Sequence, residues 1–293
     1  MVKLCIAQPL SADQIYPKPV DPKNNPSTPE KIALGQRLFN DSRLSSNETH
    51  ACATCHQPDL HFTDGLARAV GATGETHEFG TPTLYNVGLN SSLGWIDGGI
   101  TTLEAQHKIP LFNKAPIEMG FQDQYINRLT DLKPQFLKVF GTDSPVTRQL
   151  IDALAAYVRT LRPPVTRFDE YLFLDKQNAL TPEEKMGMAL FFSERLGCAH
   201  CHANTTFSGP ITAGAPVFHI TGVDPAARAF RAPTLRQIQY TAPYMHNGSV
   251  PTLTDVLRHY ESVHQQRTDV DRVPEFSLTE TERSAVVSFL KTL

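Results

Sequence analysis

The chain has 293 residues, of which 40% are hydrophobic, and a formal net charge of −3 at pH 7. This length allows about two domains of ordinary size, each with a packed core. A slightly acidic chain lacks the basic face that nucleic acid requires, and no apolar run approaches the ~18 residues of a membrane span. We therefore expect neither a nucleic-acid partner nor a membrane span.

The predicted elements repeat along the chain. A threonine N-cap with proline at the first helical position opens a helix at Thr28 and again at Thr181, where Glu184 completes a capping box. Each helix leads to a cysteine motif, then to a Pro-Thr-Leu segment (82–84 and 233–235), a glycine turn and another helix. Because no strong strand pattern interrupts these helices, the sequence predicts a mainly α protein made by internal duplication.

The boundary between the halves lies after a helix that Ser144 and Pro145 are expected to cap. Arg162-Pro163-Pro164 should end this helix, because neither proline can continue its hydrogen-bond ladder. We assign residues 22–164 to an N-terminal domain and residues 165–293 to a C-terminal domain, which closes with a helix capped by Thr279 and Glu282. The apolar stripe of the boundary helix consists of Val146, Leu150, Ile151, Leu154, Val158 and Leu161.

The repeated motifs are Cys52-Ala53-Thr54-Cys55-His56 and Cys198-Ala199-His200-Cys201-His202. Cys-x-x-Cys-His is the attachment sequence of a c-type haem. Its two thiols add to the vinyl groups of one porphyrin, and the histidine reaches the iron from the proximal side. The motifs therefore predict two cytochrome c-like domains, each with one covalently bound haem c and with His56 or His202 as the proximal ligand.

The alternative is a zinc ribbon that uses Cys52, Cys55, Cys198 and Cys201 as a Cys₄ set. Zinc ribbons usually keep their cysteine pairs closer together in sequence and need no histidine after each pair. We therefore favour haem over zinc or a redox-active thiol.

The N-terminal segment 1–7 is too short to be a complete secretory signal. Because bacteria attach haem c outside the cytoplasmic membrane, we expect a periplasmic protein whose native signal peptide is absent from this chain. The leftover Cys5 lacks the small-residue context of a lipid anchor and is interpreted as a mobile thiol.

From about Thr28 onwards the chain resembles the bacterial di-haem cytochrome c peroxidase and MauG superfamily. Residues 69–77 and the stretch through Leu103 are most similar to the MauG-like branch associated with methanobactin operons (MbnH). Besides the two haem motifs, the resemblance is carried by Phe62-Thr63-Asp64-Gly65, Trp95-Ile96-Asp97-Gly98, Leu103-Glu104-Ala105-Gln106, Ile117-Glu118-Met119-Gly120 and Thr241-Ala242-Pro243-Tyr244-Met245-His246-Asn247-Gly248-Ser249.

The resemblance implies that the N-terminal haem reacts with peroxide. Ala72 matches the position where some relatives carry a blocking histidine, which implies an open, five-coordinate iron. His77 is interpreted as a loop histidine bonded to backbone or propionate rather than as a ligand. Glu118 matches the family's acid/base glutamate, Gln106 its distal glutamine and Pro110 the proline over the iron.

The sixth ligand of the second haem follows from counting along the repeat. Pro110 lies twelve residues after Gly98, and Tyr260 lies twelve residues after Gly248. Tyr260 therefore takes the equivalent place in the second half, and a hard, anionic phenolate would stabilise high-valent iron. Met245 is the alternative, because methionine is a common cytochrome ligand. It stands where the family usually has an aromatic residue, so we expect it to pack in the core.

The resemblance assigns two further roles. Trp95, the only tryptophan, matches the residue that lies between the haems and passes an electron hole from one to the other. Thr241 and Pro243 stand where two calcium ligands are expected, although the usual asparagine is replaced at about Gly80. A Ca²⁺ ion bound through carbonyl oxygens and water stays an open alternative.

These roles predict a peroxidase-like enzyme. Hydrogen peroxide would meet the first iron, both oxidising equivalents would spread over the haems as a bis-Fe(IV) state, and this state would oxidise an aromatic residue, tryptophan in particular, of a periplasmic partner protein. The first alternative is a conventional cytochrome c peroxidase supplied with electrons by a small redox protein. The second is a di-haem electron-transfer module, which would need a sixth ligand on the first iron that the sequence does not offer.

Overall fold

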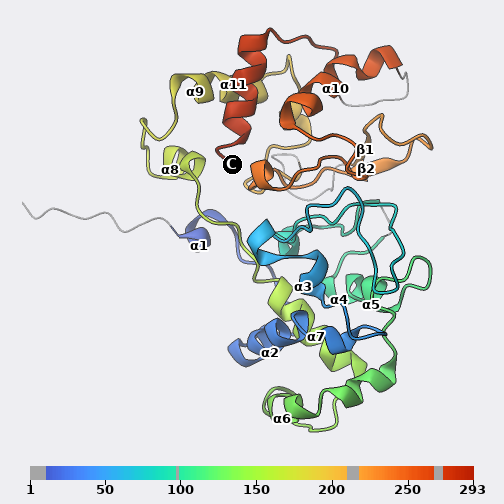
Figure 1. Ribbon diagram of the computed structural model, residues 1–293. Helices are drawn as coiled ribbons and strands as arrows, with labels where there is room; N and C mark the ends of the chain where they lie inside the picture. The colour runs from blue at the N-terminus through green and yellow to red at the C-terminus, as the bar shows by residue number, and fades with distance from the viewer. Residues whose placement is uncertain (1–10, 97–98, 210–217, 267–272) are drawn as a thin grey trace, which may run out of the picture.

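The computed structural model describes residues 11–96, 99–209, 218–266 and 273–293, so Cys5, Asp97 and Gly98 lie outside the described residues. Figure 1 shows two lobes, with the N-terminal half of the chain in one and the C-terminal half in the other. The described part is mainly α-helical, as the sequence predicts. Within it, no helix is long and apolar enough to cross a membrane.

The N-terminal lobe contains α2 to α7, the C-terminal lobe contains α8 to α11, and a short α1 lies near the connection between them (Figure 1). The only strands in the described ranges form an antiparallel hairpin with His219 opposite Phe230. The α-helices are α1 (Ala12–Ile15), α2 (Pro29–Phe39), α3 (Cys52–Cys55), α4 (Leu103–Gln106), α5 (Lys108–Phe112), α6 (Lys133–Phe140), α7 (Thr147–Val158), α8 (Arg167–Phe173), α9 (Pro182–Phe191), α10 (Leu253–Gln266) and α11 (Glu280–Leu290). The strands are β1 (Phe218–Ile220) and β2 (Ala229–Arg231), and the 3₁₀ helices are η1 (Ser42–Leu44), η2 (Pro58–Leu60), η3 (Val87–Leu89), η4 (Asp123–Arg128), η5 (Thr130–Leu132), η6 (Cys198–His200) and η7 (Ile238–Tyr240).

Three of the helix starts lie where the capping residues predict them. The Thr28 hydroxyl accepts the N–H of Lys31 at the start of α2. Thr181 with Glu184, and Thr279 with Glu282, form reciprocal capping boxes at the starts of α9 and α11. These side chains satisfy backbone N–H groups that have no partner inside the helix.

The cap of the boundary helix α7 was predicted wrongly. Ser144 and Pro145 precede the cap, which is Val146, and the Gln149 side chain accepts the Val146 N–H at 3.0 Å. Gln149 thus supplies locally the acceptor that Ser144 was expected to provide, and Val146 is left 58% exposed instead of buried. The helix also ends at Val158, before the two prolines, because the N–H groups of Thr160 and Leu161 bond three residues back in a tighter turn.

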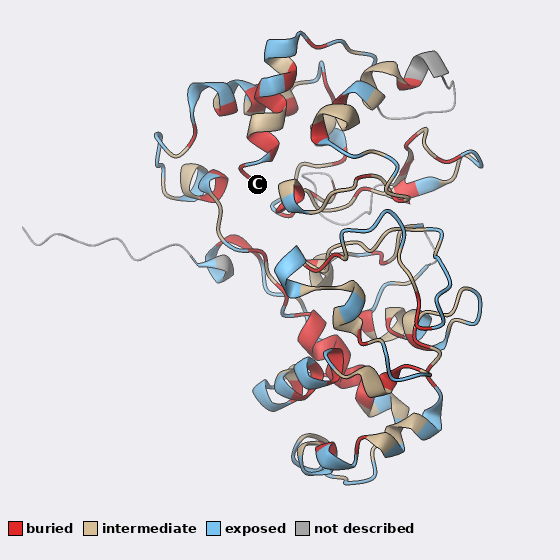
Figure 2. Cartoon of the chain, in the orientation of Figure 1, coloured by how far each residue is buried: buried red, intermediate tan, exposed pale blue. Residues whose placement is uncertain are grey.

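Each lobe has its own apolar core. The first draws on residues between Leu34 and Leu161, and the second on residues between Phe168 and Leu293. The proposed division at residue 164 falls between these two sets. Figure 2 shows the buried faces of α7 in one lobe and α11 in the other.

The same close helix contact holds each core together. A Cβ atom on Gly35 of α2 would lie 2.0 Å from the carbonyl oxygen of Ala153 on α7. In the other lobe, a Cβ atom on Gly187 of α9 would lie 1.9 Å from the carbonyl oxygen of Ala285 on α11. The two helices of each pair approach so closely that only glycine fits at the crossing.

Replacing Gly187 by alanine should therefore push α9 away from α11. We expect Gly187→Ala to lower the free energy of unfolding by about 1–3 kcal/mol, the usual cost of overpacking a core, measured by denaturant unfolding of the holoprotein. Met186→Ala, at an exposed position of the same helix, should change it by less than about 0.5 kcal/mol. Equal stability of Gly187→Ala and wild type would contradict the tight crossing.

Candidate active site

The first cysteine motif forms α3 and the residue that ends it. His56 caps the helix, and its N–H donates to the Cys52 carbonyl at 2.9 Å. Its Nδ1 lies 3.1 Å from the Phe62 carbonyl oxygen. A carbonyl only accepts, so Nδ1 carries the proton and Nε2 keeps a free lone pair. Burial lowers the pKa of His56, which favours the neutral form that binds iron.

The second motif repeats this arrangement. Cys198 opens the short helix η6, and the Nδ1 of His202 lies 2.7 Å from the Phe207 carbonyl oxygen. Burial lowers the pKa of His202 to about 4. Both histidines are thus neutral, fixed in orientation by a backbone carbonyl, and able to offer Nε2 to a metal.

A large cavity adjoins the second motif and fits a porphyrin. Its empty space is about 1160 Å³, including the part open to solvent, and its lining is largely apolar and aromatic, with Cys198, Cys201 and His202 among the residues that face it. Burial raises the pKa of the Cys52 and Cys198 thiols to about 12.

The zinc alternative fails on the placement of the four cysteines. Within the described ranges, no three His, Cys, Asp or Glu side chains are placed to hold a metal ion together. A Cys₄ site would require Cys52, Cys55, Cys198 and Cys201 to meet. The two motifs instead belong to separate lobes.

Both candidate sixth ligands line the second cavity. Tyr260, on α10, and Met245, in a left-handed turn (φ 68°), face it. The Tyr260 hydroxyl lies 3.4 Å from Nε2 of His219, on β1, and burial raises the pKa of Tyr260. His259 turns away and donates to the Thr221 carbonyl at 2.7 Å. The sequence analysis missed His219, because a single histidine in a short strand carries no spacing signal.

The residues expected around the first iron lie on α4, α5 and the loop after them. Gln106 ends α4, and its Oε1 is buried without a hydrogen-bond partner among the described residues. Pro110 lies within α5, and its carbonyl accepts the N–H of Met119, next to Glu118, at 3.0 Å. The buried side-chain oxygen of Gln106, which has no such partner, is suited to accept a hydrogen bond from a peroxide.

A neighbouring loop holds Glu118 in place. The Ala72 N–H donates to the Glu118 carbonyl at 2.8 Å, and a Cβ atom on Gly71 would lie 1.8 Å from the Ile117 carbonyl oxygen. Burial raises the pKa of Glu118 to about 7. His77, interpreted from the sequence as a loop histidine, lies with its Nδ1 4.0 Å from Glu118 Oε1. A carboxyl group that titrates near neutrality is suited to accept and return a proton.

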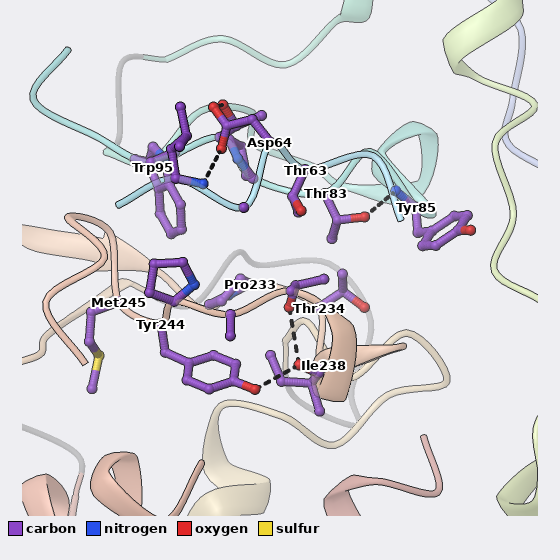
Figure 3. A pocket seen from close by; sticks show the side chains of 18 of the residues that line it. Thr63, Asp64, Thr83, Tyr85, Trp95, Pro233, Thr234, Ile238, Tyr244 and Met245 are labelled. Atoms are coloured by element: carbon purple, nitrogen blue, oxygen red, sulfur yellow. Dashed lines mark hydrogen bonds between the residues drawn. The ribbon is translucent and has the colours of Figure 1, made fainter. Parts of the chain in front are cut away.

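A second cavity, of about 710 Å³, lies between the lobes (Figure 3). Trp95 lines this cavity and also the one beside the second motif. Its Nε1–H donates to the Gly80 carbonyl at 2.9 Å, and its own carbonyl accepts the Arg231 N–H at 2.8 Å. Trp95 is therefore tied to both lobes, and in Figure 3 it faces Pro233, Tyr244 and Met245 of the C-terminal lobe.

The expected calcium ligands also lie around the cavity between the lobes. Thr241 and Pro243 line it, but the Thr241 hydroxyl donates to the Ile238 carbonyl at 3.3 Å. The Gly80 carbonyl already accepts from Trp95. The calcium site stays a prediction.

Arg231 is a further residue that the sequence analysis missed. It lines both cavities, and its guanidinium donates to the Gly94 carbonyl and to the Ser208 hydroxyl, each at 3.1 Å. No carboxylate of the described residues pairs with it, and burial lowers its pKa to about 10. A buried cation without a counter-ion fits the carboxylates of a bound haem.

Comparisons with known proteins show which family the chain resembles. A family model described as di-haem cytochrome c peroxidase matches residues 29–177, and a model of RoxA-like, cytochrome c-like proteins matches residues 229–265. The methylamine utilization protein MauG of Methylorubrum extorquens is 36% identical over 288 residues, which cover 93% of this chain and 80% of that protein. The cytochrome c551 peroxidase of Nitrosomonas europaea is 30% identical over 285 residues, covering 92% and 81%. The crystal structure of a MauG-like protein associated with microbial copper homeostasis matches with a TM-score of 0.88 and 32% identity, over 96% of this chain and 93% of that one.

Proposed function

Because the chain belongs to the di-haem cytochrome c peroxidase family, whose members are haem-dependent oxidoreductases acting on peroxide, we propose that it is a MauG-like enzyme. It uses hydrogen peroxide to oxidise an aromatic side chain, in particular a tryptophan, of a partner protein. The observation that carries this proposal is Tyr260, which lines the cavity of the second haem motif beside His219. A tyrosinate ligand favours storage of oxidising equivalents on the iron over simple electron transfer.

The residues of the chain divide the work between the two sites. The two motifs hold covalently bound haem c, which supplies the redox chemistry. At the first site, Gln106 would hold the peroxide, Pro110 would border the bound haem, and Glu118 would move a proton from the inner to the outer oxygen. Trp95, which lines both cavities, would let the two haems share the oxidising equivalents.

The cellular location of the enzyme follows from the chemistry of haem attachment. Haem attachment outside the cytoplasmic membrane places it in the periplasm, where the partner protein must also be.

The matching glycine contacts of Gly35 and Gly187 support an internal duplication with a boundary near residue 164. A Ca²⁺ ion between the lobes would bind near Thr241 and Pro243.

A conventional cytochrome c peroxidase is the second candidate. It is favoured by Met245, which lines the second cavity together with Tyr260. With methionine as the sixth ligand, the second haem would pass electrons from a small redox protein to the first haem instead of storing oxidising equivalents.

Two matched substitutions decide which side chain is the ligand. We expect Tyr260→Phe to change the absorption and electron paramagnetic resonance spectra of one ferric haem, because the phenolate oxygen is lost. Met245→Leu should leave both spectra as they are in the wild type. The reverse pattern, a changed spectrum in Met245→Leu alone, would identify methionine as the ligand and support the conventional peroxidase.

The raised pKa of Glu118 predicts a pH-dependent reaction. Only the carboxylate form accepts a proton from peroxide, so the rate of the di-ferric enzyme with peroxide should rise as pH increases through about 7. Glu118→Gln should slow the reaction by about 10²-fold or more and abolish this rise, because the amide does not take up the proton. Stopped-flow absorption between pH 5.5 and 8.5 measures both effects. The control is Glu30→Gln, which removes an exposed carboxyl on α2. A wild-type rate independent of pH would show that Glu118 is not the base.

A further inference from the structure

Tyr240 is unusual among the oxidisable aromatic residues of this chain. All eight tyrosines and the single tryptophan lie within the described residues, and among them Tyr240 is the most exposed, at 51%. It ends the short helix η7 in the C-terminal lobe. A ring this exposed is more accessible to another protein than the other rings, which are partly or fully buried.

The Tyr240 ring is held in place across the junction of the lobes. It stacks on the imidazole of His61, a residue of the N-terminal lobe, with 4.3 Å between ring centroids and an interplanar angle of 7°. The Nδ1 of His61 is buried without a hydrogen-bond partner among the described residues. Burial also lowers its pKa, so the ring is neutral. The contact is therefore a stack of two neutral rings and no ion pair.

The stacked pair is connected along the chain to residues of both haem sites. His61 precedes Phe62, whose carbonyl oxygen accepts the Nδ1–H of the proximal His56. In the other lobe, Ile238 at the opposite end of η7 lines the second cavity and the cavity between the lobes. In the sequence, Tyr240 is thus two positions from Ile238, which lines the second site. Its stacking partner His61 is one position from Phe62, whose carbonyl holds the proximal histidine of the first site.

A third ring extends the pair toward the interior. Tyr85 lines the cavity between the lobes and meets His61 edge-on, at 6.1 Å between centroids. Closely packed aromatic rings therefore run from that cavity, which Trp95 also lines, to the exposed Tyr240. The chain has no second tryptophan that could take this place at the surface.

We propose that Tyr240 is the exit site, at which the oxidising equivalents leave the enzyme for an aromatic side chain of the partner protein. This inference rests on the proposed function. In each one-electron step, Tyr240 gives one electron to the oxidised haems and its phenolic proton to water. The resulting tyrosyl radical takes one electron and one proton from the donor ring. Two such steps use the two oxidising equivalents of one peroxide, which becomes two water molecules.

Proton release distinguishes Tyr240 from the buried tyrosines. Oxidation of a tyrosine near neutral pH expels the phenolic proton, so the hydroxyl needs a nearby acceptor. Burial raises the pKa of Tyr85 and Tyr244, which border the same cavity, and so opposes the loss of their protons. The half-exposed Tyr240 releases its proton directly to solvent.

Two substitutions of Tyr240 separate its redox role from its packing role. Phenylalanine keeps the stack on His61 but is not oxidisable, whereas tryptophan keeps both the stack and the redox activity. The di-ferric holoenzyme is mixed with one equivalent of hydrogen peroxide, and then N-acetyltryptophanamide is added as the donor. We expect Tyr240→Phe to slow the return of the ferric spectrum at least about tenfold. Tyr240→Trp and the control Tyr171→Phe should return within about twofold of the wild-type rate.

A second readout follows the radical itself. Freeze-quenched wild-type enzyme without donor should show a tyrosyl radical in electron paramagnetic resonance, and Tyr240→Phe should lack it while forming the oxidised haems at the wild-type rate. Equal decay with donor in Tyr240→Phe and wild type would overturn the exit site and leave the proposed function intact. If the wild-type haems do not react with peroxide at all, the proposed function itself is wrong.

Discussion

Trp95 is anchored by one hydrogen bond in each half of this enzyme. The indole N–H donates to the Gly80 carbonyl of its own lobe, and the Trp95 carbonyl accepts the Arg231 N–H of the other. Because the ring lines both the cavity of the second haem motif and the cavity between the lobes, a shift of either lobe would move it away from one of them. The proposed sharing of oxidising equivalents depends on this fixed position.

The chemistry at each of the two haem sites depends on simpler local constraints. Each proximal histidine donates from Nδ1 to a phenylalanine carbonyl, which fixes its tautomer and leaves Nε2 for iron. Burial raises the pKa of Glu118 to about 7 and, in the second cavity, raises that of Tyr260. The first shift produces an acid/base group that works near neutral pH. The second keeps the free phenol protonated, so that binding to ferric iron has to displace the proton.

The sequence was a good guide where the signal is local. The haem motifs and the caps at Thr28, Thr181 and Thr279 are short patterns whose function depends on neighbouring residues. The cap at Ser144 was predicted wrongly for a reason of the same kind, because the Gln149 side chain competes for the same N–H. Tyr260 was found by counting along the repeat, and the structure places it in the second cavity, but Met245 lies there too.

The contacts between segments far apart in the chain left no comparable pattern in the sequence. His219 reaches Tyr260 from a two-stranded hairpin, and Arg231 spans both cavities, yet neither belongs to a spaced motif. The stack of His61 on Tyr240 joins residues far apart in the sequence and exists only because the lobes meet. Such sites depend on tertiary packing, which periodicity and capping rules do not describe.

The most direct test of the account is Mössbauer spectroscopy of the ⁵⁷Fe-labelled di-ferric enzyme mixed with one equivalent of hydrogen peroxide. The account predicts that both irons change together to high-valent signals within the same reaction phase, and that Trp95→Phe leaves the second iron ferric. An enzyme whose ferric irons are both inert until one is reduced, and which then turns over rapidly with reduced cytochrome c, would contradict it.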